Sequence, residues 1–121
     1  MTIEQLVRFF AEISAAQGEA IELLGTTKAN RLVTRMVAVR DELARRPDDG
    51  LAALATLFSH PNVWARYNSA NMLLDQMAAT ARPVIQANAE SNDFPIAGHA
   101  GMTLSFFDGN LSDLVSRQRN S

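Results

Sequence analysis

The chain has 121 residues, the length of one domain. Its formal net charge of −2 excludes a strongly basic surface of the kind that attracts nucleic acid or an anionic membrane. It contains no cysteine, which excludes disulfides, thiolate metal ligands and cysteine nucleophiles. No apolar run approaches the length of a membrane span, and the first five residues carry no basic side chain, so we expect a cytoplasmic protein.

The composition favours an all-α fold. Hydrophobic residues make up 47% of the chain and charged residues 20%, which is ordinary for a globular protein. Aromatic residues make up only 7%, whereas alanine and leucine are abundant, and this balance favours helix over sheet. We therefore expect a single all-α domain over residues 1–121.

The first predicted helix spans residues 2–24. Thr2 and Gln5 have the spacing of a capping box, and Gly25 is placed to end the helix in a left-handed conformation. Gly18 lies inside the helix, where glycine costs about 1 kcal/mol relative to alanine, so it either permits close packing of another helix or marks a break. The inward stripe comprises Ile3, Leu6, Val7, Phe10, Ile13, Gln17 and Ile21.

The second predicted helix spans residues 27–46 and ends before Pro47, which cannot continue it. It is rich in arginine, whereas the first helix is rich in glutamate. If the two helices fold back on each other, opposite charges meet along their length, and the basic residues are paired rather than free for nucleic acid. The expected pairs are Glu22 with Lys28, Glu19 with Arg31, Arg8 with Glu42, and Glu4 with Arg45 or Arg46.

The middle of the chain predicts a short apolar helix over residues 49–59 and a longer helix over residues 63–77. Pro61 shapes the turn between them, and Asn62 is placed to cap the longer helix. Arg66 lies at the edge of the apolar face, where we expect a structural role, bridging to an acid or to helix-end carbonyl groups. The face expected to be buried comprises Val63, Tyr67, Ala70, Leu73, Leu74 and Met77.

The last predicted pair comprises helices over residues 80–90 and 96–108, separated by a cluster of turn-forming residues. Pro83 is compatible with the first turn of its helix. Gly109 is expected to end the second helix, which leaves a tail over residues 109–121.

The chain thus contains three helix pairs, over residues 2–46, 49–77 and 80–108. A shift of 34 residues superimposes Pro61 on Pro95, each of which precedes the second helix of its pair. A period of this length is typical of helix-pair solenoids, so we predict three stacked antiparallel pairs in a short HEAT-like α-solenoid. The same shift aligns inward positions, as in Ala29, Val63 and Ala97, or Met36, Ala70 and Leu104.

The stretch from Leu57 to Leu73 resembles a HEAT-type repeat, which has a turn proline, then a valine and an arginine, and an alanine before the closing leucine. Val63 and Arg66 are separated by two residues here, whereas many HEAT units have them nearly adjacent. Over nearly its full length the chain also resembles an uncharacterised family of small bacterial proteins with a HEAT-like core. The resembling pieces are residues 16–20, 28–32, 60–62 and 100–104. This resemblance implies a fold and no particular activity.

No motif of a known catalytic or cofactor site is present. The sequence lacks a glycine-rich phosphate loop, Gly-x-Ser-x-Gly and His-Glu-x-x-His. Two histidines without a nearby pair of carboxylates make a poor metal site. We expect His60 to cap its turn or face solvent, and His99 to be buried and hydrogen-bonded. We therefore expect no enzymatic activity, no cofactor and no metal.

The outward face of the helix over residues 63–77 is the candidate binding surface. At about 100° per residue, Trp64 turns away from the core onto a polar stripe beside Met72. The ring either anchors a partner or packs under helix 27–46 or helix 96–108, and in both cases we expect it to be half covered. The candidate contact residues are Trp64, Asn68, Asn71 and Asp75, joined by Asn30, Thr34 and Met102 from the neighbouring second helices.

Two functions from different classes fit this sequence. The first is a non-enzymatic module that binds a protein or peptide, or a second copy of itself, on the face formed by the second helix of each pair. The second is a small-ligand-binding protein or an enzyme that uses a polar groove near Asn30, Asn68, Asn71 and His99. DNA binding along the arginine-rich helix is a weaker third, and neither nucleic acid nor membrane is expected as a partner.

Overall fold

The computed structural model describes the backbone of residues 1–47 and 49–119, and the side chains of residues 1–47 and 49–109. Within these residues the chain forms six α-helices, one 3-10 helix and no strand, which confirms the predicted all-α class. None of the described helices is both long enough and apolar enough to span a lipid bilayer. The elements are α1 (Ile3–Glu22), α2 (Thr26–Ala44), α3 (Gly50–Leu54), the 3-10 helix η1 (Ala55–Ser59), α4 (Val63–Met72), α5 (Ala78–Ala89) and α6 (Phe94–Arg119).

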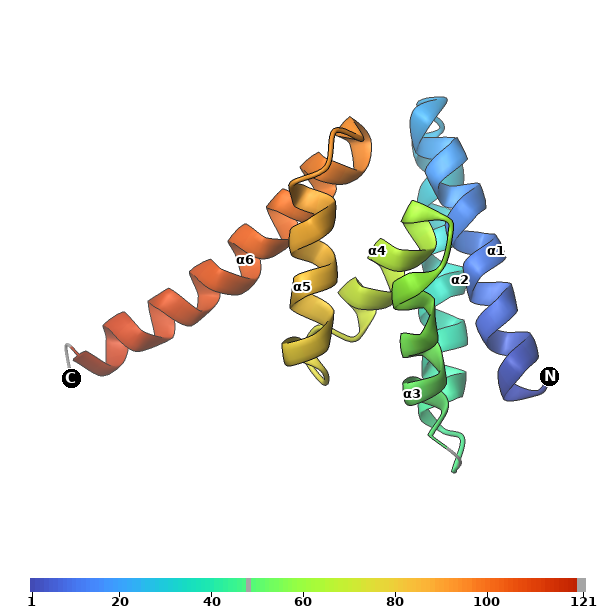
Figure 1. Cartoon of the computed structure of the whole chain (residues 1–121), viewed down its shortest axis with the longest axis horizontal. Coiled ribbons are helices and arrows are strands. Elements are labelled where there is room, and N and C mark those ends of the chain that lie inside the picture. The colour runs from blue at the N-terminus through green and yellow to red at the C-terminus, as the bar shows by residue number, and fades with distance from the viewer. Residues whose placement is uncertain (48, 120–121) are drawn as a thin grey trace.

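α1 and α2 form an antiparallel hairpin (Figure 1). The capping box at its start is complete, because Thr2 and Gln5 each accept from the other's backbone N–H, at 3.1 and 2.8 Å. The hairpin turn differs from the prediction, since the left-handed residue is Leu24, with φ of 59°, whereas Gly25 has a negative φ and precedes α2. α1 therefore ends at Glu22, before the predicted residue 24, because a left-handed residue cannot continue a right-handed helix.

The ion pairs expected between α1 and α2 do not form among the described side chains, so that prediction is wrong. Instead, Arg45 and Arg46 near the end of α2 pair with Glu42 of the same helix, at 2.9 and 3.0 Å. Residues three and four apart already share a helix face, so these arginines need no partner from α1. Hydrogen bonds from Arg45 and then Arg46 lower the pKa of the Glu42 carboxyl.

The second helix pair begins with a short, irregular element. Asp49 has a left-handed φ of 56°. A Cβ on the next residue, Gly50, would collide with the backbone carbonyl of Leu43, so glycine is needed where the chain turns this close to α2. α3 then tightens into η1, and together the two elements cover residues 50–59 of the predicted range 49–59.

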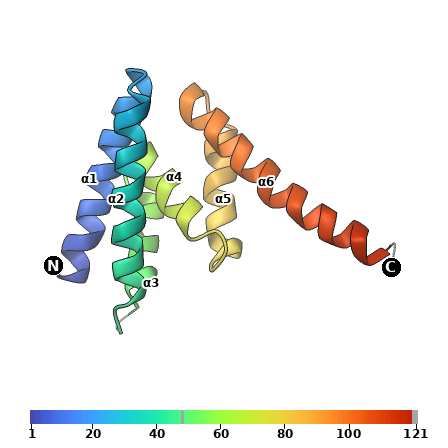
Figure 2. The same cartoon turned by 180° about the vertical axis from the view of Figure 1, so that it is seen from behind.

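α4 lies between the two hairpins, with α1 and α2 on one side and α5 and α6 on the other (Figures 1 and 2). Its start is capped by Asn62, whose Oδ1 accepts from the backbone N–H groups of Trp64 and Ala65 at 3.0 and 3.1 Å. It ends at Met72 rather than at the predicted residue 77, and the fully buried Leu73 follows as its C-cap.

Two hydrophobic cores meet at α4. One is built mainly from α1, α2 and α3, and the other mainly from α5 and α6. A helix covered from both sides buries more than one stripe, so the prediction of a single buried face on this helix is wrong. α4 and its C-cap region supply Ala65 and Leu73 to the first core, and Trp64, Tyr67, Ala70 and Leu74 to the second.

α5 and α6 form the second hairpin, joined on its surface by an ion pair of 2.6 Å between Arg82 and Asp108. α5 begins at Ala78, earlier than the predicted residue 80, so Pro83 lies inside the helix and not in its first turn. The helix therefore lacks one backbone donor in its interior.

α6 does not end at Gly109, and its backbone stays helical to Arg119. No described glycine has a positive φ, so Gly109 supplies no left-handed stop. The prediction of a separate tail from residue 109 is thus wrong for the described backbone up to residue 119. In Figure 1 this part of α6 extends past α5. The last two residues of that predicted tail lie outside the described part of the chain.

Candidate functional site

A cleft of about 450 Å³ lies between α1 and the second helices of the three pairs, α2, α4 and α6. Figure 2 views the face formed by these second helices, with α2 and α6 on either side of α4. None of the lining side chains is a lysine, arginine, aspartate or glutamate. The cleft is lined by Gln17, Ile21, Leu24, Thr26, Ala29, Asn30, Val33, Met36, Tyr67, Asn68, Asn71, Met72 and His99.

The structure brings together all four residues predicted to form a polar groove. Asn30, Asn68, Asn71 and His99 come from three different helices, and each lines the cleft. Asn68 is buried, whereas the other three are exposed at the opening. The spacing of the second helices thus positions these side chains around one concavity.

Trp64 does not lie on the surface, which corrects its predicted half-covered position. The side chain is only 4% exposed and packs against two helices of its own chain. From α1, Gly18 approaches so closely that a Cβ there would collide with the indole ring. From α6, His99 meets the ring edge-on, with a centroid distance of 5.5 Å. The indole is therefore covered by helices of its own chain and is not exposed to contact a partner.

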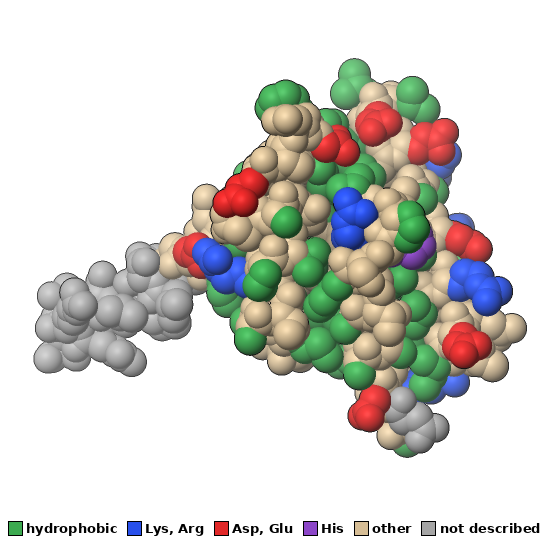
Figure 3. Space-filling view, viewed as in Figure 1, with side chains coloured by type: hydrophobic (Ala, Val, Ile, Leu, Met, Phe, Trp, Pro, Cys, Tyr) green, Lys and Arg blue, Asp and Glu red, His purple; other side chains and the backbone are tan. Residues whose placement is uncertain are grey.

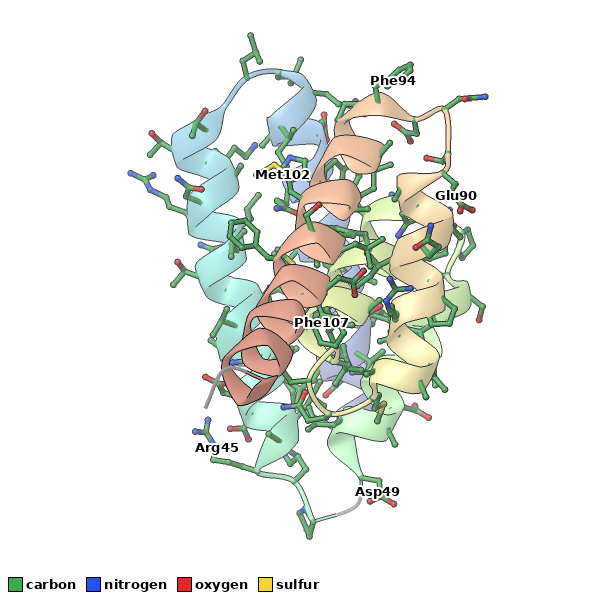
Figure 4. All side chains as sticks on the ribbon, turned by 90° about the vertical axis from the view of Figure 1, so that its left-hand side faces the viewer. Arg45, Asp49, Glu90, Phe94, Met102 and Phe107 are labelled. Atoms are coloured by element: carbon green, nitrogen blue, oxygen red, sulfur yellow. The ribbon has the colours of Figure 1, made fainter. Side chains whose placement is uncertain are left out.

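The remaining predicted contact residues lie outside the cleft lining. Thr34 is exposed and donates its hydroxyl hydrogen to the Asn30 carbonyl at 3.2 Å. Asp75 is exposed beyond the end of α4. Met102 is 63% exposed on α6, one turn after His99, and lies on the side of α6 nearer α2 in Figure 4.

A pair of buried amides lies at the inner wall of the cleft. Asn68 Nδ2 donates to Gln17 Oε1 at 2.7 Å, and the two residues are only 5% and 7% exposed. The sequence places Gln17 on the inward stripe of its helix, and sequence reasoning missed it as a site residue. The available signal was an amide standing alone on an otherwise apolar stripe.

Tyr67 connects α4 to α6 beside the cleft. Its hydroxyl lies 2.6 Å from Thr103 Oγ1, and Thr103 in turn donates to the His99 carbonyl at 3.1 Å. Burial raises the pKa of the Tyr67 phenol, although the hydrogen bond with Thr103 lowers it, so the phenol stays protonated near neutral pH. His99 itself is exposed, which corrects the expectation of a buried histidine, although its ring forms a T-shaped pair with Trp64.

Several large apolar side chains are exposed on the two hairpins, α1–α2 and α5–α6, and one of them lines the cleft. Leu24 lines the cleft, is 89% exposed and holds the left-handed conformation of the α1–α2 turn. That conformation disfavours a side chain with a Cβ, and glycine or asparagine would adopt it more readily. The other exposed large apolar residues are Met1, Leu23, Phe94, Met102 and Phe106.

A second hollow, of about 500 Å³, lies between η1 and α5 on the opposite face of the molecule. Figure 3 shows apolar side chains gathered there. Arg66 lines it and donates to the carbonyl groups of His60 and Pro61 at 2.7 and 3.1 Å, so it braces its own turn rather than a neighbouring pair. Asn88 also lines it, and its Nδ2 is enclosed without a hydrogen-bond partner among the described residues.

The described residues contain no group of three or more histidine, aspartate or glutamate side chains that could hold a metal ion. The cleft therefore offers hydrogen-bonding groups from amides and one imidazole, together with apolar side chains. These groups suit recognition of an uncharged partner that carries its own amide groups.

Residues 4–108 match a family described as a domain of unknown function, DUF2019. The matched range includes every residue that lines the cleft. The chain is also similar to the solved structure of the protein RPA1889 from Rhodopseudomonas palustris CGA009, with a TM-score of 0.83, 36% sequence identity and 90% of each chain covered. No curated protein matches the sequence.

Proposed function

The chain belongs to the DUF2019 family, and from its cleft we propose that it is a non-enzymatic module that binds a peptide segment of another protein. The binding surface is the face formed by α2, α4 and α6. The observation that carries the proposal is the concave, largely apolar lining of the cleft, which continues into the exposed side chain of Leu24. Such continuity is typical of surfaces that bind protein segments.

Leu24 is the strongest support for a contact surface. Its left-handed backbone costs about 1 kcal/mol for a non-glycine residue, and its side chain gains almost no burial within the chain. Folding of the isolated chain therefore gives no reason for leucine at this position. Contact with the apolar side chain of a partner would supply one, because burying a leucine contributes about 2 kcal/mol.

The predicted HEAT-like arrangement of the helix pairs is part of the same proposal. We take α1–α2, α3–η1–α4 and α5–α6 as three units of one HEAT-like repeat. The 34-residue alignment of Pro61 with Pro95 supports it, as does the position of α2, α4 and α6 around a common concavity. Repeat proteins of this kind use the concave surface for binding.

A second candidate function is a small-ligand-binding protein or an enzyme that uses the same cleft. It is supported by the meeting of Asn30, Asn68, Asn71 and His99 at one concavity. The peptide proposal accounts for more of the surface, because it also gives a role to the exposed apolar side chains of Leu24 and Met102.

Peptides selected from a random display library on the purified protein test the proposal. We expect a selected peptide to lose about tenfold or more in affinity when Asn30→Arg or Leu24→Gly alters the cleft, because each change disturbs the contact surface. Both residues are exposed, so neither change removes core packing. Leu24→Gly should not lower the melting temperature, since glycine adopts the left-handed turn without strain.

Ala52→Arg is the matched control, because Ala52 is exposed on α3 and lines neither hollow described above. It should leave the affinity of the selected peptide unchanged. Equal loss of binding in the control and the cleft variants would contradict the proposal. A failure to select any peptide, together with stabilisation by a small molecule that Asn30→Arg abolishes, would favour the second candidate.

A further inference from the structure

The amide pair of Gln17 and Asn68 has hydrogen-bonding capacity that the chain does not use. Their mutual bond of 2.7 Å occupies one donor and one acceptor. Within residues 1–47 and 49–109, no other group bonds to Gln17 Nε2 or to Asn68 Oδ1. Neither atom is fully enclosed, because the sole fully enclosed and unpartnered side-chain nitrogen or oxygen in that part of the chain is Asn88 Nδ2.

This arrangement does not depend on how the two amides are oriented. If both side-chain amides are turned over, Gln17 becomes the donor of the mutual bond and Asn68 its acceptor. The pair then still presents an NH₂ group and a carbonyl oxygen that take no part in the mutual bond. A side chain more than nine-tenths buried that keeps such groups unpaired loses stability unless something pairs with them.

We propose that Gln17 and Asn68 form an anchor for the main chain of an extended peptide bound in the cleft. The pair would donate to the C=O and accept from the N–H of one peptide residue. This inference rests on the proposed peptide-binding function and identifies what the cleft recognises.

Extended main chain fits the pair for a geometric reason. In an extended strand, a residue presents its own N–H and C=O along the same edge, as in the hydrogen-bonded pairs of an antiparallel sheet. An adjacent donor and acceptor can therefore bond both groups at once. Recognition of this kind is independent of the residue's side chain, and β-augmentation uses the same principle.

The surroundings of the pair indicate the side chains of the bound segment. The cleft lining includes no lysine, arginine, aspartate or glutamate, so a charged side chain would be desolvated there without a partner. Ile21, Val33 and Met72 line the same cleft and offer apolar contacts beside the amides. The bound segment is therefore uncharged and apolar where it crosses the pair.

The direct test is an NMR titration of the ¹⁵N-labelled protein with N-acetyl-leucine N′-methylamide, the smallest probe with a complete residue of main chain. The side-chain NH₂ signals of Gln17 and Asn68 should shift in a saturable manner. The same probe with both amide nitrogens fully methylated lacks N–H donors and should leave these signals in place. Equal shifts with both probes, or no shift with either, would overturn the proposal.

The second test uses a peptide selected on the cleft. Gln17→Glu keeps the acceptor for Asn68 but replaces the open donor by an acceptor, so affinity should fall by about tenfold or more. Ala52→Asp is the control, since it adds the same charge at an exposed position that lines neither the cleft nor the second hollow. Its affinity should change by less than about threefold. Equal losses in the two variants would show a charge effect and overturn the anchor.

N-methylation of each peptide residue in turn separates the two proposals. Methylation at a single position should abolish binding, because only one peptide residue uses its N–H to bond the Gln17–Asn68 pair. If no position is sensitive while Asn30→Arg and Leu24→Gly still weaken binding, the anchor is wrong and the peptide-binding function stands. If acetamide shifts the Gln17 and Asn68 signals as strongly as the leucine probe, and methylation is silent, the pair recognises a small amide and the peptide anchor is wrong.

Discussion

Gly18 lies against the indole of Trp64 where α1 passes α4. Glycine inside a helix is unfavourable, and the structure supplies the reason for it here. A Cβ would occupy the position of the indole, and the rings of Tyr67 and His99 also pack against the indole and restrict its movement. Of the two explanations open from the sequence, close packing is therefore the correct one, since α1 stays helical through residue 18.

Gly18→Ala should destabilise the protein by about 1–3 kcal/mol, although alanine is the better helix former, because overpacking against a buried ring outweighs the gain in propensity. Chemical denaturation measures the change. Gly98→Ala on α6 is the control, since a Cβ there meets nothing within 4 Å, and it should raise stability by up to about 1 kcal/mol. The same sign for both variants would show that Gly18 is not packed as described.

At the scale of elements, the end of α4 distinguishes two adjacent residues. Leu73 is fully buried in the core shared with α1 and α2. Met72 lines the cleft and is half-buried against the same core, whereas the sequence places it beside the outward polar stripe. The difference arises because α4 ends at Met72, and its C-cap residue Leu73 packs into the core of α1 and α2.

Leu73→Ala should cost about 2–5 kcal/mol of unfolding free energy, because the leucine loses both transfer energy and packing contacts. Met72→Ala should cost about 1 kcal/mol, since only part of its side chain is covered. Urea denaturation of the two variants measures both values. A larger loss for Met72→Ala would mean that the path of the chain after α4 is described wrongly.

The whole molecule consists of two helical hairpins that share α4. The indole of Trp64 belongs to the core of α5 and α6 and touches α1, so it crosses the boundary between the hairpins. Contacts of this kind make the two halves fold as one cooperative unit. In the isolated chain, Trp64 emission should therefore be blue-shifted and resistant to quenchers, because the ring is excluded from water.

Trp64→Ala should cost about 3–5 kcal/mol in dilute monomer and should uncouple the two hairpins. Hydrogen exchange with peptide resolution measures this directly. In the wild type, α1 and α5 should show comparable protection, whereas in the variant α5 and α6 should exchange faster than α1 and α2. Uniform loss of protection across the chain would show that the boundary is not where cooperativity is lost.

The sequence by itself determined the features that depend on neighbouring residues. The all-α class, the order of the helices, the capping box at Thr2 and the cap at Asn62 follow from local patterns that any fold must respect. Helical periodicity also placed Asn30, Asn68 and Asn71 on faces that meet in one cleft. Each of these features needs only residues a few positions apart.

Only the tertiary structure decided which faces are covered and by what. A single-stripe rule assumes that a helix has one neighbour, whereas α4 has a hairpin on each side, and so Trp64 and Asn68 are buried. The same holds for Gln17, whose partner lies 51 residues away in the chain. Hydrophobic burial and hydrogen bonding act between residues brought together in space, and no local pattern in the sequence encodes which residues those are.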